Sequence, residues 1–318
     1  MIVIKRFLAT LFFAAAVLML AACGEAQAAG VAARAETITV THISGETEVP
    51  IEPRRVAVFD FGVLDTMYQL GLTDRIIGIA GTSLPNYLSH LDGLFPSFGT
   101  LHEPNLELLA AENPDLIIIS GRARPMFDEL NSLAPTIDLG LINDDFLGSF
   151  WANNIYIGRI FGVEEQVDIS LGQINASIDQ VYQYASGLDK NSLIILHNNG
   201  SLRAFGPGSR FGIIHDVLGV TPVDPNIEIA THGYIISNEY IVSMDPDIIF
   251  VVDRNAAVEE GEAANREDIE NELVRLTTAY QNNNIFYLSS DLWYVSQGGI
   301  GGILMQIEEI RNAVSQAN

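Results

Sequence analysis

The stretch NLELLAAENPDLIIISGR, residues 105–122, decides the fold, because the chain repeats its pattern as SNEYIVSMDPDIIFVVDR at residues 237–254. Each copy has a short amphipathic segment, a Pro-Asp turn, an apolar run suited to a buried strand, and a closing arginine. The two copies align without a gap, so that Glu107 matches Glu239 and Arg122 matches Arg254. Coincidence is the alternative, but the repeat favours two lobes of similar build.

Short apolar runs alternate with amphipathic stretches along the rest of the chain. This alternation predicts an α/β fold with two lobes and largely parallel sheets in each lobe. The expected strands are Val56–Phe59, Ile76–Ile79, Leu116–Ser120, Ser192–His197, Ile248–Val252 and Ile285–Leu288. The expected helices are Gly62–Leu70, Leu106–Glu112, Pro125–Leu133, Phe211–Leu218, Asn238–Met244, Arg266–Gln281 and Gly301–Ala317.

A single long helix is expected between the two copies, over Glu164–Ser186. Its apolar residues recur at alternating spacings of four and three, which places them on one face. At about 1.5 Å per residue this helix would be roughly 35 Å long. A surface helix of one domain is the alternative, but its place between repeated halves favours a rigid connector. We therefore expect an N-terminal lobe over 37–163, a connecting helix over 164–187 and a C-terminal lobe over 188–318.

The first residues are typical of a signal peptide. Two basic residues, Lys5 and Arg6, precede an uncharged apolar run over residues 7–20. This run has the length of a signal-peptide core and is too short to anchor the chain across a bilayer. The sequence therefore predicts export.

The apolar run ends in LAACG, residues 20–24, which resembles a bacterial lipobox. This resemblance implies cleavage after residues 1–22, lipid attachment to Cys23, and a flexible tether over residues 23–36. An ordinary signal peptide with a chance thiol is the alternative. We expect the protein at the cell membrane, on its outer face, or on the periplasmic side where there are two membranes.

Composition excludes several classes of function. The chain has 16 Lys and Arg against 40 Asp and Glu, a formal net charge of −24 at pH 7. Loss of Lys5 and Arg6 with the signal peptide would take this charge to −26. Nucleic acid is therefore a poor partner, since phosphate binding needs clustered basic residues. Cys23 is the only cysteine, so its acylation would leave none for a disulfide, for catalysis or for a thiolate metal site.

Two arginines stand out in this acidic chain. Arg122 and Arg254 each follow a predicted buried strand. Ligands of open parallel sheets bind beyond the carboxyl ends of the strands, so two facing lobes would point both arginines into a cleft. A surface salt bridge on each lobe is the alternative.

Further candidates lie in loops of the second half. The glycine-rich segment SLRAFGPGSRFG, residues 201–212, lacks the lysine of a phosphate loop, so nucleotide binding is rejected. Arg210, at the start of the following helix, can meet an anion. His232 lies in a loop before the second copy, and Tyr294 lies in the segment WYVSQGG, residues 293–299. A loop histidine is usually solvated and a tyrosine usually packs, but these loops can share one edge.

Taken in order, these segments resemble a known family. The chain is similar to bacterial periplasmic binding proteins whose two lobes are joined by one long helix, the FecB-like group of iron-siderophore and cobalamin importers. The likeness covers residues 37–316 and is closest to petrobactin- and catecholate-siderophore-binding lipoproteins of ABC importers. The stretches that carry it are residues 58–65, 118–122, 208–212, 231–233 and 250–255.

The resemblance implies roles for individual residues. It gives Arg122, Arg210 and Arg254 to the anionic oxygens of a ferric catecholate siderophore, with Arg124 able to share or replace the role of Arg122. It implies that His232 and Tyr294 ligate iron directly when a tetradentate siderophore leaves two sites open. Arginine suits several oxygens at once, and imidazole and phenolate suit open sites on iron.

The resemblance also implies partners. In this family a surface glutamate on each lobe docks onto the membrane permease, and Glu107 and Glu239 are the candidates, unless they are only helix-surface acids. The partners expected are the ferric siderophore, an ABC permease and its ATPase, and the membrane through the lipid anchor. We expect a monomer with no permanently bound cofactor.

Other functions are left as alternatives. Haem or cobalamin is the nearest rival ligand, although cobalamin would favour an aromatic cleft over three arginines. A zinc or manganese importer would need clustered histidines, and the six histidines are scattered along the sequence. An exported hydrolase is a further alternative, but the chain has no Gly-x-Ser-x-Gly or His-Glu-x-x-His motif. We therefore expect a binding protein and not an enzyme.

Overall fold

A computed structural model describes residues 36–81, 83–258 and 266–317, and contacts group the chain from Thr37 onward into one compact unit. The predicted lipid site at Cys23 and most of the predicted tether lie outside these ranges. Within the ranges, no helix is long and apolar enough to cross a membrane.

The first lobe is built on a four-stranded sheet in the order β4-β3-β5-β6, in which every pairing is parallel. The residues of β3 and β5 are all buried, as expected for a parallel sheet that is covered on both faces. The strands are β3 (Val56–Val58), β4 (Ile76–Ile79), β5 (Leu116–Ile119) and β6 (Thr136–Asp138), and an antiparallel hairpin of β1 (Thr37–His42) and β2 (Gly45–Pro50) precedes them. The helices of this lobe are α2 (Phe61–Gln69), α3 (Leu106–Glu112) and α4 (Phe127–Leu133).

The second lobe has a mixed sheet in the order β10-β8-β7-β11-β12, with β9 beside β7. Strands β7, β9, β11 and β12 run parallel, but β8 and β10 are antiparallel to their neighbours. The expectation of a largely parallel sheet is therefore met fully in the first lobe and only in part here. The strands are β7 (Asn191–Asn198), β8 (Ser201–Phe205), β9 (Thr221–Pro222), β10 (Tyr234–Ile236), β11 (Ile248–Asp253) and β12 (Ile285–Tyr287).

Helices cover the second sheet and fill its loops. The longer ones are α8 (Asn238–Met244) and α13 (Ile300–Gln316), and the short ones are α7 (Ile213–Asp216), α9 (Arg254–Val258), α10 (Arg266–Ile269), α11 (Thr278–Gln281) and α12 (Ser290–Tyr294). Short 3₁₀ helices lie at Thr73–Arg75, Asn86–Leu91, Arg124–Met126, Asn143–Asp145 and Val274–Leu276.

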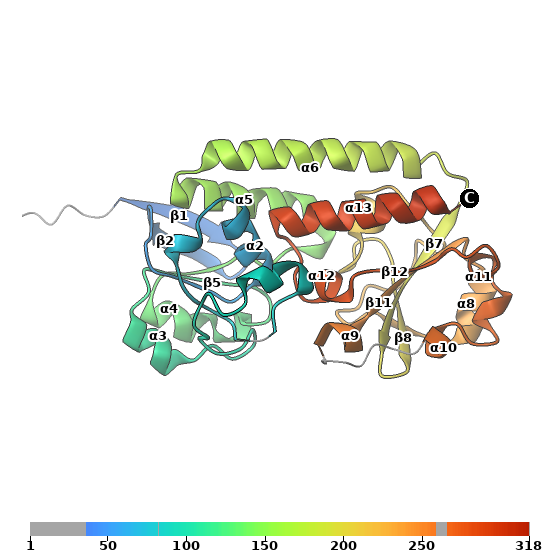
Figure 1. Cartoon of the computed structure of the whole chain (residues 1–318), viewed down its shortest axis with the longest axis horizontal. Coiled ribbons are helices and arrows are strands. Elements are labelled where there is room, and N and C mark those ends of the chain that lie inside the picture. Colours follow the sequence, from blue (N-terminus) through green and yellow to red (C-terminus); the bar gives the residue numbers. More distant parts are fainter. Residues whose placement is uncertain (1–35, 82, 259–265, 318) are drawn as a thin grey trace, which may run out of the picture. The chain divides into compact units, whose positions relative to one another are not determined.

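The long helix predicted between the copies is α6 (Glu164–Ala185), which packs against α13 and against α5 (Phe146–Phe161), as Figure 1 shows. The sequence did not predict α5. Its first two turns place Phe146 and Phe150 in the core of the second lobe, and its end places Ile160 in the core of the first. Two helices therefore pass between the lobes.

The two copies of the repeat have the same local structure. Helices α3 and α8 each have seven residues and each end in a left-handed residue, Asn113 at φ 47° and Asp245 at φ 43°. The aspartate of each Pro-Asp turn accepts backbone hydrogen bonds at the start of the neighbouring central strand, Asp115 from Arg55 and Asp247 from Asn191. Side chains thus fix each helix-to-strand turn to its sheet.

The predicted helix over Arg266–Gln281 is wrong. Three short pieces, α10, a 3₁₀ turn and α11, take its place. The break has a local cause, because the Asn271 side chain accepts hydrogen bonds from the backbone N–H groups of Leu273 and Val274. Thr277 then caps α11 by accepting from the N–H of Tyr280. Such side-chain acceptors compete with a continuous helix.

Candidate functional site

A cavity of about 990 Å³ is lined by residues of both lobes. The first lobe supplies the segment after β4 and the turn after β5, and the second supplies α9 and α12. Its lining includes Leu84, Asn86, Asp92, Leu101, His102 and Arg122 from the first lobe, and Arg254, Ala256, Val258, Asp291, Tyr294 and Val295 from the second. The arginines that close the two copies of the repeat therefore face one space.

Three arginines converge on Tyr294, the last residue of α12. Arg122 donates from Nη2 to the Tyr294 carbonyl oxygen at 2.8 Å and from Nη1 to the Val295 carbonyl oxygen at 3.2 Å. Arg210 donates to the same Tyr294 carbonyl, and Arg254 Nε donates to the Tyr294 hydroxyl at 3.0 Å. The three guanidinium carbons lie 5.9, 4.4 and 5.7 Å from the centre of the Tyr294 ring. Cations so close to an aromatic face are attracted by its quadrupole.

Neutral groups hold these three arginines. Their acceptors are backbone carbonyls, the Tyr294 hydroxyl and the Asn198 amide, and within the described residues no ion pair joins any of the three to a carboxylate. Burial and the charge of Arg122 lower the pKa of Arg210 to about 10, so Arg210 stays charged at neutral pH. The cluster therefore keeps its positive charge, in a protein of net charge −24.

Asp60 is the carboxylate that interacts electrostatically with Arg122. It caps α2 by accepting from the N–H of Val63 at 2.8 Å, and it accepts from the Ser120 hydroxyl at 2.6 Å. Burial raises the pKa of Asp60, although these hydrogen bonds and the charge of Arg122 act in the opposite direction. The Asp60 oxygens are thus engaged by hydrogen bonds within the first lobe.

Two of the predicted ligand contacts lie away from this cluster. Arg124 Nε lies 2.5 Å from the buried carboxylate of Asp138, and Arg124 does not line the cavity. His232 is exposed in the loop before β10, makes no hydrogen bond or ion pair with the described residues, and does not line the cavity. The structure thus brings Arg122, Arg210, Arg254 and Tyr294 together, but not Arg124 or His232.

The two glutamates of the repeat are exposed in the first turns of α3 and α8. A hydrogen bond with the Ser237 hydroxyl lowers the pKa of Glu239. Both side chains are therefore accessible, on equivalent helices of the two lobes.

The sequence did not lead us to predict that the segment after β4 lines the cavity. Its His102 sits in a loop that the Thr100 hydroxyl holds, since this oxygen accepts from the N–H groups of His102 at 3.2 Å and Glu103 at 2.9 Å. The strand-end rule that selected Arg122 applies equally to Ile76–Ile79, and could have selected this segment. Among the described residues there is no cluster of three or more His, Cys, Asp or Glu side chains that could hold a metal ion.

Comparisons with known proteins agree on one family. A family model described as periplasmic binding protein matches residues 56–292. The petrobactin-binding protein YclQ of Bacillus subtilis is 40% identical over 318 residues, which cover 98% of this chain and 100% of the relative. Its crystal structure has a TM-score of 0.85 over 88% of this chain and 99% of that one.

Two further relatives are described as binders of siderophores. The ferric-anguibactin-binding protein FatB of Vibrio anguillarum is 30% identical over 282 residues, 86% of each chain. The periplasmic catecholate-siderophore binding protein VctP of Vibrio cholerae is 32% identical, with a TM-score of 0.81 over 87% of this chain and 100% of that one. The two solved structures, of YclQ and VctP, share the fold of this chain over 88% and 87% of its length.

Proposed function

Because the chain belongs to the periplasmic binding protein family, we propose that it is the substrate-binding component of an ABC importer for ferric siderophores. It captures a ferric siderophore of the catecholate type, petrobactin-like or a bis-catecholate, and delivers it to a membrane permease. The siderophore is its cargo, and the protein catalyses no reaction.

The observation that carries this proposal is the group of three arginines around Tyr294. A ferric tris-catecholate has about three negative charges, and its oxygens suit guanidinium donors that present several N–H groups at once. Because neutral acceptors hold Arg122, Arg210 and Arg254, no carboxylate cancels their charges. Arg122 and Arg254 line the cavity, and Arg210, which does not line it, adds its charge beside Tyr294. Chains with this acidic composition would otherwise repel such an anion.

We propose that Tyr294 acts on the iron as well. Its hydroxyl accepts from Arg254 Nε at 3.0 Å on the wall of the cavity, and a tyrosine oxygen is a suitable ligand for an open site on iron. We propose Tyr294 as an iron ligand for tetradentate siderophores, with His232 as the second ligand after movement of its loop. Tyr294→Phe should then weaken binding of a ferric bis-catecholate and remove a phenolate-to-iron absorption band, while a hexadentate tris-catecholate is less affected. Equal losses for both ligands would count against ligation.

The proposal extends to the partners. The exposed Glu107 and Glu239 lie on equivalent helices of the two lobes and would dock onto the permease. Substitution of both by Ala should abolish siderophore uptake by cells while leaving the affinity of the purified protein unchanged. Lipid on Cys23 would keep the protein at the membrane, and Cys23→Ala should release it into the soluble fraction. Unchanged uptake, or unchanged membrane association, would refute the corresponding role.

The binding function is tested by titration of intrinsic fluorescence. Trp293 is fully buried beside Tyr294, so an iron complex in the cavity should quench it. Ferric bis-catecholate and ferric tris-catecholate are compared with haem, cobalamin and ferric citrate. We expect saturable quenching by the catecholates at micromolar concentration or below. Quenching by haem or cobalamin but by no catecholate would overturn the proposal.

A further inference from the structure

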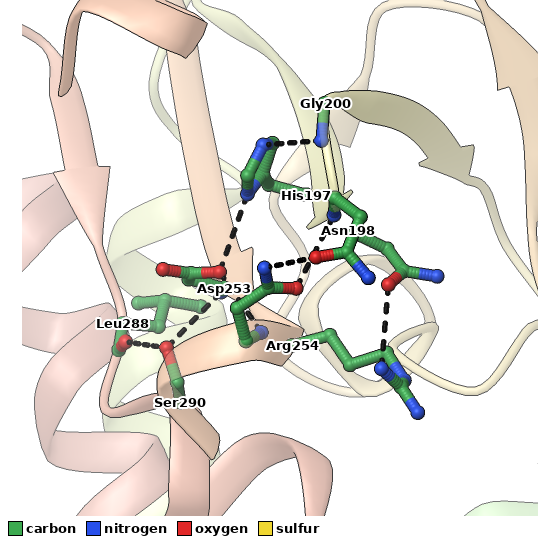
Figure 2. Close-up of polar contacts among 9 residues, drawn as sticks. His197, Asn198, Gly200, Asp253, Arg254, Leu288 and Ser290 are labelled. Atoms are coloured by element: carbon green, nitrogen blue, oxygen red, sulfur yellow. Dashed lines mark hydrogen bonds and ion pairs between the residues drawn. The ribbon is translucent and has the colours of Figure 1, made fainter. Parts of the chain in front are cut away.

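Three consecutive residues where β7 ends pair with three consecutive residues where β11 passes into α9. Strands β7 and β11 are parallel neighbours, and the last residues in their register are His197 and Asp253. The side chains continue this register beyond the sheet (Figure 2). Each pair is separated by 56 positions, and the pairs are His197 with Asp253, Asn198 with Arg254, and Asn199 with Asn255.

The first pair fixes the end of β11. The N–H of Gly200 donates to His197 Nε2 at 3.1 Å, so the imidazole proton is on Nδ1 and points to Asp253 Oδ1 at 3.3 Å. His197 and Asp253 are 3% and 6% exposed. Asp253 Oδ1 also accepts from the N–H of Asn255 at 3.1 Å, which ties down the start of α9. Arg254 lies between these two fixed residues.

The third pair fixes the turn that follows β7. Asn199 and Gly200 have φ values of 48° and 76° and form the two-residue connection to β8, a conformation that Asn-Gly favours. The N–H of Asn199 donates to Asn255 Oδ1 at 3.2 Å, and Asn255 Nδ2 donates back to Asn199 Oδ1 at 2.5 Å. The backbone on both sides of Asn198 is therefore held against α9.

The middle pair alone reaches the cavity. Arg254 Nη1 donates to Asn198 Oδ1 at 3.3 Å, while its Nε donates to the Tyr294 hydroxyl. Arg254 lines the cavity and Asn198 does not. Asn198 thus contacts the guanidinium from a position outside the lining of the cavity.

We propose that Asn198 is a positioning residue for Arg254, which holds this guanidinium toward the cavity without neutralising its charge. An amide oxygen accepts a hydrogen bond but carries no charge, whereas an aspartate at this place would form an ion pair with Arg254. The inference rests on the proposed function, since the Arg254 charge that Asn198 leaves unneutralised is one that attracts an anionic siderophore. It adds a residue outside the cavity to those that set affinity.

The test compares substitutions that differ in charge and in position. The probe is ferric enterobactin, a hexadentate tris-catecholate complex, titrated by fluorescence quenching. Asn198→Ala should weaken binding about 2- to 10-fold, the range for one hydrogen bond, and Asn198→Asp about 10- to 100-fold, because it neutralises a cation. Asn199→Asp is the matched control, since it adds the same charge one residue away and keeps its acceptor for Asn255. It should weaken binding at most about 5-fold.

A double-mutant cycle separates positioning from a general structural role. Once Arg254→Ala has removed the guanidinium, Asn198→Ala should cause no further loss of affinity. An equal loss in both backgrounds would overturn the inference, as would equal effects of the two aspartate substitutions. The cycle tests the positioning role of Asn198 even where Asn198→Asp fails to fold, because it uses only the alanine substitutions. Failure of the unsubstituted protein to bind any ferric catecholate would instead refute the proposed function, and with it this inference.

Discussion

The two copies of the repeat end in the same residue but hold it in different ways. Arg254, in the second copy, is held within its own lobe by Asn198 and reaches Tyr294 through a side-chain hydroxyl. Arg122, in the first copy, crosses to the other lobe and donates to the backbone carbonyls of Tyr294 and Val295. Equivalent positions in a repeat therefore bring an arginine to the same edge of each sheet, while the neighbours decide what holds it.

The difference comes from the segment that follows each central strand. After β7 the chain turns back at Asn199 into the hairpin with β8, which leaves Asn198 beside Arg254. After β3 the chain enters α2, and continuing the strand registers by number matches Arg122 with Gly62 as Arg254 is matched with Asn198. A Cβ atom on Gly62 would lie 2.2 Å from the Gln297 carbonyl oxygen. The first lobe thus uses this place for close contact with the second lobe.

The largest effect is expected from removal of the two arginines. Arg122→Ala and Arg254→Ala should each weaken binding of a ferric catecholate by about 10- to 100-fold, because each removes a charged hydrogen-bond donor. Arg122→Ala should also lower the free energy of unfolding by about 1–3 kcal/mol, since it removes hydrogen bonds to backbone carbonyls of the other lobe, and Arg254→Ala, whose bonds to side chains lie within one lobe, should lower it less. Titration and chemical denaturation measure the two quantities.

Arg311→Ala is the control for this pair of substitutions. Arg311 forms an exposed ion pair with Glu308 three residues away, so its loss should change affinity very little and stability by less than about 1 kcal/mol. If Arg254→Ala destabilised the protein as much as Arg122→Ala, the distinction between the two copies would be lost.

An intermediate effect is expected from Gly62, which corresponds to Asn198 in the first lobe. Gly62→Ala should destabilise the protein by about 1–3 kcal/mol, because the new methyl group would overlap the backbone at Gln297 and Gly299. Gly172→Ala is the matched control on α6, where a Cβ meets nothing within 4 Å. It should stabilise the protein by about 0.5–1 kcal/mol, the difference in helix propensity. Similar unfolding midpoints for the two variants would contradict close packing at Gly62.

The smallest effect concerns the second lobe alone, where α7 follows Arg210. His215 of α7 is buried and donates from Nδ1 to the Val220 carbonyl oxygen at 2.8 Å. Burial lowers the pKa of His215 below its ordinary value of 6.5, so the unfolded chain takes up this proton first as the pH falls. The neutral His215 therefore contributes to the free energy of unfolding above about pH 6.5. As the pH falls below this value the contribution is lost, with a limiting slope of about 1.4 kcal/mol per pH unit.

His215→Gln should remove this component of the pH dependence. Denaturation of both proteins between pH 7 and pH 5 is the measurement, and the difference between their free energies of unfolding should shrink as the pH falls. A difference that stays constant over this range would show that burial does not lower the pKa of His215.

Much of the fold could be predicted because the signals were local. Helices α3 and α8 and strand β4 have the expected bounds, since capping residues and apolar runs mark their ends in the sequence. Helix α5 was missed because its buried positions include polar residues such as Ser149 and Asn154, which satisfy backbone carbonyls inside the packing. Only the tertiary structure shows that these positions are covered.

The candidate site could be predicted as far as its strand-end residues. Arg122 and Arg254 face one cavity because the sheets of both lobes present their carboxyl ends to it. Arg124, only two residues from Arg122, turns to Asp138 within its own lobe, and spacing alone could not separate the two arginines. The direction of a loop histidine is set by distant contacts, so the sequence could not place His102 on the cavity wall and His232 away from it.

The most direct test of the central claim is a crystal structure of the protein with a ferric bis-catecholate. We predict that catecholate oxygens lie within hydrogen-bonding distance of the guanidinium groups of Arg122, Arg210 and Arg254. The Tyr294 oxygen should have moved from Arg254 to the iron, and the Arg254–Asn198 hydrogen bond should remain. A ligand bound elsewhere, with all three arginines still directed only at Tyr294 and Val295, would contradict the account.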